Sequence, residues 1–161
     1  MEIQNPLWVF ALKVYAKPQV EACLLQLQEE YGLSINRLLF AGWLAMQHKT
    51  VELAAVESSA ATCWQKTLTH PLRALRYQVR AELQADESLR SLYKAMRQAE
   101  LQAEQIEIAK LYALSLELSL SDESVESLML KNLKTVSQAQ GISDEICDIL
   151  SFLGKEMLSE G

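Results

Sequence analysis

The residues best suited to nucleophilic chemistry are three cysteines, and their setting in the sequence argues against that role. A cysteine becomes reactive when a nearby cation or a helix N-terminus lowers the pKa of its thiol. Cys23 lies inside a predicted helix at the edge of an apolar stripe, and no histidine can be assigned as its base. We therefore interpret Cys23 as a small buried hydrophobic residue and assign no catalytic residue.

Metal binding in a helical protein calls for histidines and carboxylates at Glu-x-x-His spacing, and the sequence has no such motif. The two histidines, His48 and His70, each stand beside a predicted helix break. Glu100, Glu104 and Glu107 share one helical face but alternate with glutamines, so we interpret them as a solvated face. The sequence predicts no metal site and no cofactor, and it favours a protein that is not an enzyme.

The middle of the chain is basic although the whole chain is acidic. Residues 66–97 hold seven basic and three acidic residues, residues 111–161 hold three and nine, and the net charge is −6. Arg73, Arg76 and Arg80 fall within roughly 60° of arc on one predicted helix and are the candidate partner-binding residues. They can engage phosphates or an acidic protein surface. The alternative, slightly favoured, is that they pair with the acidic C-terminal helices or cover apolar neighbours.

A second candidate site is a set of polar and aromatic residues around the chain reversal at Gly32. Gln28, Asn36 and Arg37 are best explained as side chains that satisfy exposed backbone groups at this corner. The alternative is a small apolar pocket with a few polar groups, the usual form of a ligand site. Its candidate residues are Tyr15, Gln28, Asn36 and Trp43, with Arg73 as a further polar group.

Helix signals recur along the whole chain and predict an all-α fold. Five glycines and three prolines are too few for the frequent turns of an all-β protein. Asn5 with Pro6, and then Pro18, open the first two predicted helices, Gly32 ends the second, and Ser34 caps a third that we expect to be central. A fourth helix is predicted over about residues 51–67, a fifth from residue 71 onward and a sixth over about residues 87–118. A seventh runs from the 121–123 cluster to residue 140, and a last one starts after Gly141 and Ser143.

These elements predict a single-domain helical bundle of about seven helices over residues 1–161. Residues 1–48 form an apolar three-helix core segment, 66–97 the basic central segment and 111–161 the acidic C-terminal helices. The helix over 51–67 is expected to be interrupted at His70–Pro71, because proline disfavours helical geometry in the residue before it. The long helix over 87–118 is expected to pack antiparallel to its neighbours.

The cysteines and the N-terminal residues predict a soluble cytoplasmic protein. Three cysteines that lie far apart form neither a disulfide framework nor a zinc motif, which fits a reducing compartment. The apolar run from Leu7 to Ala16 contains Lys13 and is too short to span a bilayer. It also lacks the flanking features of a secretory signal.

A distinctive set of residues fills the first third of the chain, and a shorter set follows near residue 71: Trp8, Phe10, Tyr15, Pro18, Val20, Cys23, Leu24, Leu27, Gln28, Gly32, Leu33, Asn36, Leu38, Leu39, Phe40 and Trp43, then Pro71, Leu72, Arg73 and Arg76. In these residues the chain resembles a bacterial (proteobacterial) family of similar length that is catalogued as a domain of unknown function. The chain departs from the family pattern at Gln19, where a glycine is usual, and at Ser34, where an aspartate is usual. Ser34 still serves as a cap. The resemblance implies a cytoplasmic bacterial protein and no activity.

Three functions remain open, and they differ in class. The leading hypothesis is a non-enzymatic interaction or adaptor protein that binds a protein partner through the basic central helices, or self-associates into a homo-oligomer. The alternative is a small-molecule binder or enzyme with an apolar pocket between the first three helices. The third, RNA binding by the basic segment, is disfavoured because a pI near 5.0 opposes nucleic-acid binding.

Overall fold

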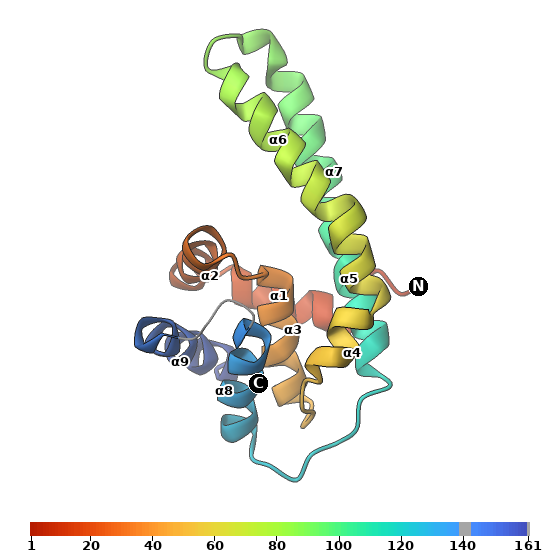
Figure 1. Cartoon of the computed structure of the whole chain (residues 1–161), viewed down its shortest axis with the longest axis vertical. Helices are drawn as coiled ribbons and strands as arrows, with labels where there is room; N and C mark the ends of the chain where they lie inside the picture. Colours follow the sequence, from red (N-terminus) through yellow and green to blue (C-terminus); the bar gives the residue numbers. More distant parts are fainter. Residues whose placement is uncertain (139–142, 161) are drawn as a thin grey trace.

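The computed structural model describes residues 1–138 and 143–160, and it confirms the predicted all-α fold (Figure 1). Its α-helices are α1 (Pro6–Tyr15), α2 (Pro18–Tyr31), α3 (Ile35–Met46), α4 (Leu53–Ser58), α5 (Ala60–Trp64), α6 (His70–Leu83), α7 (Arg90–Ser115), α8 (Val125–Ser137) and α9 (Asp144–Leu158). A π-helical segment, η1 (Gln65–Thr69), joins α5 to α6, and a 3₁₀ turn, η2 (Glu87–Leu89), precedes α7. No helix of the described residues is both long and apolar enough to cross a membrane.

The first three helices begin and end at the predicted residues. Asn5 Oδ1 accepts a hydrogen bond from the backbone N–H of Trp8 at 2.9 Å, and Ser34 Oγ accepts one from the N–H of Arg37. Gly32 ends α2 in the left-handed conformation, with φ of 67°, which costs a glycine little because it has no Cβ. Local capping chemistry therefore sets this part of the fold.

Helix α3 is the centre of the hydrophobic core, as expected from its broad apolar face. It packs against α1, α2, α7, α8 and α9, and its residues from Leu38 to Ala45 are all buried. Gly42 allows α9 to pack close to α3, because a Cβ at this position would collide with Sδ of Met157. The buried core extends from α1 to α9 and includes residues of α7 and α8.

The side chain of Asn132 joins α8 to α3 and to the segment that follows α3. The side chain is fully buried, and its Nδ2 donates to the carbonyl oxygens of Ala41 at 3.2 Å and Lys49 at 2.9 Å. Its Oδ1 accepts from the N–H of Val51 at 3.0 Å. This one amide thus satisfies backbone groups from two segments that are far from it in sequence.

Replacing Asn132 with alanine is expected to lower the free energy of unfolding by about 2 kcal/mol, because the buried N–H of Val51 loses its acceptor. Urea denaturation followed by circular dichroism measures this loss. Thr135→Ala on the same helix is the control, since within the described part of the chain its hydroxyl bonds only to the carbonyl of Lys131 near the surface. Equal stability of the two variants would contradict the role given to Asn132.

The region between α3 and α6 differs from the expected single helix with a break at His70–Pro71. Ser59 divides it, since its side chain caps α5 by accepting from the N–H of Thr62. The helix then continues through Pro71 instead of stopping, because residues 65–69 adopt π-helical geometry. The N–H of His70 bonds to the carbonyl of Gln65, five residues back. The wider π turn gives room for the proline ring, which clashes with the preceding turn of a regular α-helix.

Helices α6 and α7 run antiparallel, as predicted for the long helix, and we call residues 70–115 the hairpin (Figure 1). The C-terminal half of α7 packs on the core, whereas the rest of the hairpin extends away from it. Helix α6 contains no buried residue. The hairpin is therefore a projecting element with much of its surface free.

The last two helices also begin at capping residues. Ser124, and not the predicted 121–123 cluster, caps α8 by accepting from the N–H of Ser127 at 3.2 Å. Ser143 caps α9, as expected. The predicted end of the penultimate helix at Gln140 and the stop at Gly141 lie outside the described residues.

Candidate functional site

A hollow of about 860 Å³ lies between the first three helices and the hairpin. One wall carries residues of α1, α2 and α3, and the other carries residues of α6 and α7. A second hollow of about 750 Å³ adjoins it. The two hollows share Gln28, Glu29, Arg73, Tyr77 and Arg80, so we treat them as one continuous surface and call it the groove.

The groove brings together the two candidate sites that the sequence suggested separately. Of the pocket candidates, Tyr15, Gln28 and Asn36 line one wall. All three partner-binding candidates, Arg73, Arg76 and Arg80, line the other. The predicted pocket lay between the first three helices alone, whereas this hollow lies between those helices and the hairpin.

Trp43 was predicted as the fourth pocket residue, but it does not belong to this site. Its side chain is 7% exposed and lies in the core. Its ring meets that of Tyr112 edge to face, with 5.7 Å between the centroids. Helix α3 is packed on several sides, and its apolar face that contains Trp43 is turned to α7 and the core.

Gln28 and Asn36 do not stabilise the Gly32 corner, contrary to the favoured interpretation. The described residues give neither side chain a hydrogen bond to the backbone there, and Ser34 provides the cap. Arg37, the third polar residue of that set, binds Glu57 at 2.6 Å and donates to Oγ1 of Thr62 at 2.9 Å. Gln28 and Asn36 both line the groove.

Arg73 and Arg76 are held by carboxylates of α7, not by the acidic C-terminal helices. Arg73 Nε lies 2.8 Å from Glu100 Oε1, and its Nη2 lies 2.6 Å from Glu104 Oε1. Arg76 binds the other oxygen of Glu100. The glutamates of this network do not form the solvated face that the sequence suggested, since Glu100 is only 6% exposed.

The arginine pairs determine the ionisation of Glu100. Burial alone raises the pKa of a carboxyl group, but the hydrogen bonds from Arg76 and Arg73 outweigh burial and hold the pKa of Glu100 below its usual value. The pKa of Arg76 is raised by the same contact. The inner part of the groove is therefore a closed ion-pair network with its charges compensated.

Glu107 lies two helical turns beyond Glu100 on α7 and is only 2% exposed. Its Oε1 accepts from Nε2 of Gln65 at 3.0 Å, and Gln65 also donates to Oγ of Ser34. Burial raises the pKa of Glu107 to about 7, against the opposing effect of the polar side chains of Asn36 and Thr69. The Gln65 amide of the π-helical segment thus joins Glu107 of α7 to Ser34 at the start of α3.

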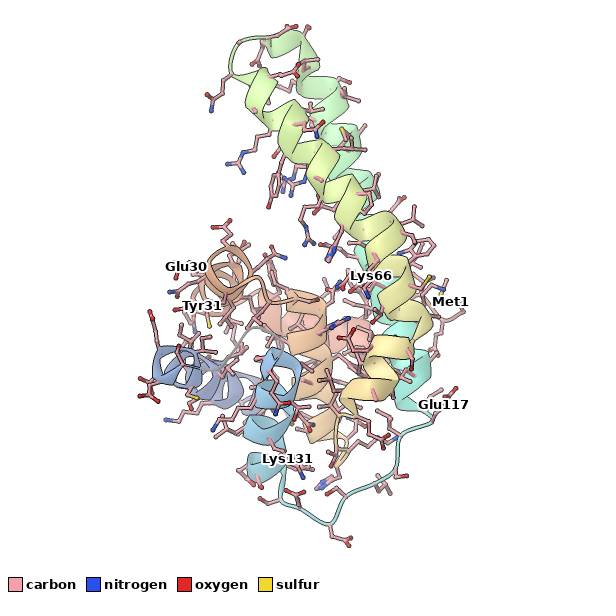
Figure 2. All side chains as sticks on the ribbon, in the orientation of Figure 1. Met1, Glu30, Tyr31, Lys66, Glu117 and Lys131 are labelled. Carbon is pink, nitrogen blue, oxygen red and sulfur yellow. The ribbon has the colours of Figure 1, made fainter. Side chains whose placement is uncertain are left out.

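Four groove cations have no ion pair among the described residues, and all four are exposed: Lys66, Arg80, Lys94 and Arg97. Two groove carboxylates of α2, Glu21 and Glu29, are likewise exposed and have no ion pair among the described residues. Side chains that end in nitrogen project from the hairpin toward the space beside α2 (Figure 2). The hairpin wall therefore carries uncompensated positive charge.

Large apolar side chains lie exposed among these charges. Leu12 of α1 is 52% exposed, Leu101 of α7 48% and Tyr77 of α6 43%, and all three line the groove. Contiguous apolar patches rimmed by polar groups are a feature of interaction surfaces, and these three side chains place apolar groups on both walls of the groove. The groove thus combines exposed apolar side chains with exposed cations.

The arrangement shows no catalytic set within the described residues. Cys23 is 8% exposed, and burial raises the pKa of its thiol, which agrees with the interpretation as a buried hydrophobic residue. No cluster of three or more histidine, cysteine or acidic side chains suited to a metal ion occurs in this part of the chain.

Sequence reasoning missed Lys94 and Arg97 as individual site residues. Both belong to the basic segment, and with Arg90 they follow the helical spacing of four and then three residues. This spacing was a usable signal for one basic helix face. That this face meets α2 across a groove depends on the tertiary arrangement.

Comparison with known proteins gives a family without an assigned activity. The model of a family described as "Protein of unknown function (DUF2390)" matches residues 6–111. These residues include α1 to α6 and most of α7, so all residues of the first hollow fall inside the matched range. No curated protein and no solved structure matches the chain.

Proposed function

We propose that this chain, which belongs to the DUF2390 family of proteins of unknown function, is a non-enzymatic binding protein that holds an acidic surface of a partner protein in its groove. The observation that carries the proposal is the set of exposed cations on the hairpin that have no ion pair among the described residues, chiefly Arg80, Lys94 and Arg97, beside exposed apolar side chains. Charge-assisted hydrogen bonds from guanidinium and ammonium groups to carboxylates give such a surface affinity and orientation.

A protein partner fits the groove better than nucleic acid does. The chain carries a net charge of −6, and binding to a phosphate backbone is dominated by positive charge. Glu21 and Glu29 on the α2 wall would repel phosphates that enter the groove. A protein surface can place carboxylates toward the hairpin and other groups toward α2.

The test reverses two groove charges in Lys94→Glu/Arg97→Glu. Arg73 and Arg76 are unsuitable for this purpose, because their ion pairs also stabilise the hairpin. Tagged wild type and variant are used for affinity capture from a nuclease-treated cell lysate, and each captured protein is quantified by mass spectrometry. We expect retention of the partner to fall about tenfold or more, since each exposed ion pair contributes up to ~1 kcal/mol and its reversal adds repulsion.

The matched control is Lys13→Glu/Lys155→Glu, which changes the net charge equally at two exposed positions outside the groove. Capture by this control should equal capture by wild type. Equal loss in both variants would show a general charge effect and would contradict a groove-specific contact.

A small-molecule ligand remains the second candidate, because one observation favours it. The hollow of about 860 Å³ lies within the range of roughly 300–1,000 Å³ that ligand sites occupy, and Tyr15, Gln28 and Asn36 give it polar groups. A metabolite library screened for a rise in the unfolding temperature tests this function.

We also propose a reducing, cytoplasmic setting for the protein. Support comes from Cys23, Cys63 and Cys147, which are all free cysteines. Persistent free thiols fit such a compartment.

A further inference from the structure

We propose that the segment held in the groove is an amphipathic helix of the partner with its charges segregated: acidic residues on the flank that faces the hairpin and basic residues on the flank that faces α2. This inference rests on the proposed function, because it names the chemistry of the occupant of the same groove. It follows from three properties of the walls: their backbone, their apolar side chains and the opposite signs of their unpaired charges.

The backbone of the walls excludes recognition by strand addition. The groove is lined chiefly by residues of α1, α2, α3, α6 and α7, and the backbone groups inside a helix are bonded within it. The one β-type pairing of the described residues, between Lys49 and Leu120, lies outside the groove. An occupant must therefore be recognised through side chains, which is how helices dock into grooves between helices.

Apolar side chains on both walls call for an apolar stripe on the occupant. Leu12 lies on the core side of the groove, and Leu101 lies on the hairpin side. Trp8, Leu25 and Ile35 line the core side as well and are partly exposed. A helix with apolar residues at i, i+3, i+4 and i+7 presents one stripe that can cover both sides at once.

The unpaired charges have opposite signs on the two walls. The hairpin presents Arg80, Lys94 and Arg97, whereas the inner Arg73 and Arg76 are compensated by Glu100 and Glu104. Glu21 and Glu29, which are eight residues apart on α2, are exposed and have no ion pair among the described residues. A helix with one sign of charge on both flanks would be repelled by one wall, so the walls select a helix with segregated flanks.

A displayed peptide library tests the occupant directly. Each 18-residue peptide carries leucine at fixed i, i+3, i+4 and i+7 positions, and its flanking positions are randomised among glutamate, lysine and glutamine. Selection on the full chain should enrich glutamate on one flank and lysine on the other. Selection on Lys94→Glu/Arg97→Glu should lose the glutamate preference, and selection on Glu21→Lys/Glu29→Lys should lose the lysine preference.

Two synthetic peptides make the test quantitative. One has segregated flanks, and the other has the same residues with the charges mixed between the flanks. We expect the segregated peptide to bind wild type about tenfold more tightly in fluorescence anisotropy, a difference of about 1.4 kcal/mol. A central proline, which breaks the helix, should abolish binding.

The outcomes separate this inference from the proposed function. Equal affinity of the two peptides, or binding that survives the proline, would overturn the segregated helix. If both peptides still lose affinity for Lys94→Glu/Arg97→Glu, the acidic-partner function stands. Absence of any enrichment overturns the inference. Light scattering gives a further test. If the wild-type chain is a dimer and Lys94→Glu/Arg97→Glu is a monomer, a second copy of the chain occupies the groove, and the inference is overturned.

Discussion

Replacing Glu100 with alanine is expected to lower the free energy of unfolding by about 3 kcal/mol, the lower end of the cost of breaking a buried ion pair. Glu100 accepts from both Arg73 and Arg76, and its side chain is 8% exposed while theirs are 19% and 14% exposed. Among the described residues, removing the carboxylate leaves Arg76 without an ion-pair partner and Arg73 paired with Glu104 alone. The remaining exposure of the arginines is the reason for the lower figure.

Chemical denaturation of Glu100→Ala and of Glu104→Ala provides the comparison. Glu104 has a side chain that is 28% exposed and pairs with Arg73 alone, so its loss should cost only about 1 kcal/mol. Equal effects of the two substitutions would contradict the central position of Glu100. Arg76→Ala combined with Glu100→Ala should cost less than the sum of the single changes, because the two residues interact directly.

Replacing Glu107 with glutamine is expected to stabilise the protein by about 3 kcal/mol at pH 8 and to leave it nearly unchanged at pH 4.5. Burial raises the pKa of Glu107 from 4.5 to about 7, so the folded state binds this proton more tightly than the unfolded state does. Stability is therefore highest when the group is protonated, and it falls as pH rises through the window from about 4.5 to about 7. Glutamine has the same shape and carries no charge to desolvate.

Urea unfolding of wild type and Glu107→Gln at several pH values measures the difference. Subtracting the unfolding free energy of wild type from that of the variant at each pH removes the contributions of other titrating groups. One such group is His70, whose pKa is lowered by burial and by Arg73 and Arg37. The polar and charged groups around Glu107 include Gln65, Asn36 and Thr69, with Glu104 and Arg73 acting at longer range. A difference between the two proteins that does not change with pH would contradict a raised pKa at Glu107.

The helix starts and ends could be predicted from the sequence because capping acts over three or four residues. The oxygens of Asn5 and Ser34 bond to N–H groups three positions ahead, and Gly32 needs only its own freedom to adopt a positive φ. The break expected at Pro71 was wrong for a related reason. A local proline rule does not include the option of a π-helical turn, which is stabilised here by packing of η1 against α7.

The candidate site could be predicted in its residue types but not in its assembly. Arginines at helical spacing indicated a functional face, yet their glutamate partners lie 24 to 31 residues away in the sequence. The same spacing rule assigned Glu100 and Glu107 to solvent, because periodicity shows that residues share a face and does not show what covers it. Only the folded chain places Tyr15 and Asn36 opposite the hairpin.

The most direct test of groove binding is a charge-swap titration with the segregated helical peptide. Wild type should bind the peptide, Lys94→Glu/Arg97→Glu should lose it, and a peptide with lysine in place of the hairpin-facing glutamates should recover binding to that variant. Recovery shows that the groove cations and the acidic flank are energetically coupled, because exchanging both charges restores the attraction between them. If the swapped peptide binds neither protein, or binds wild type and variant equally, the groove does not recognise an acidic partner through Lys94 and Arg97.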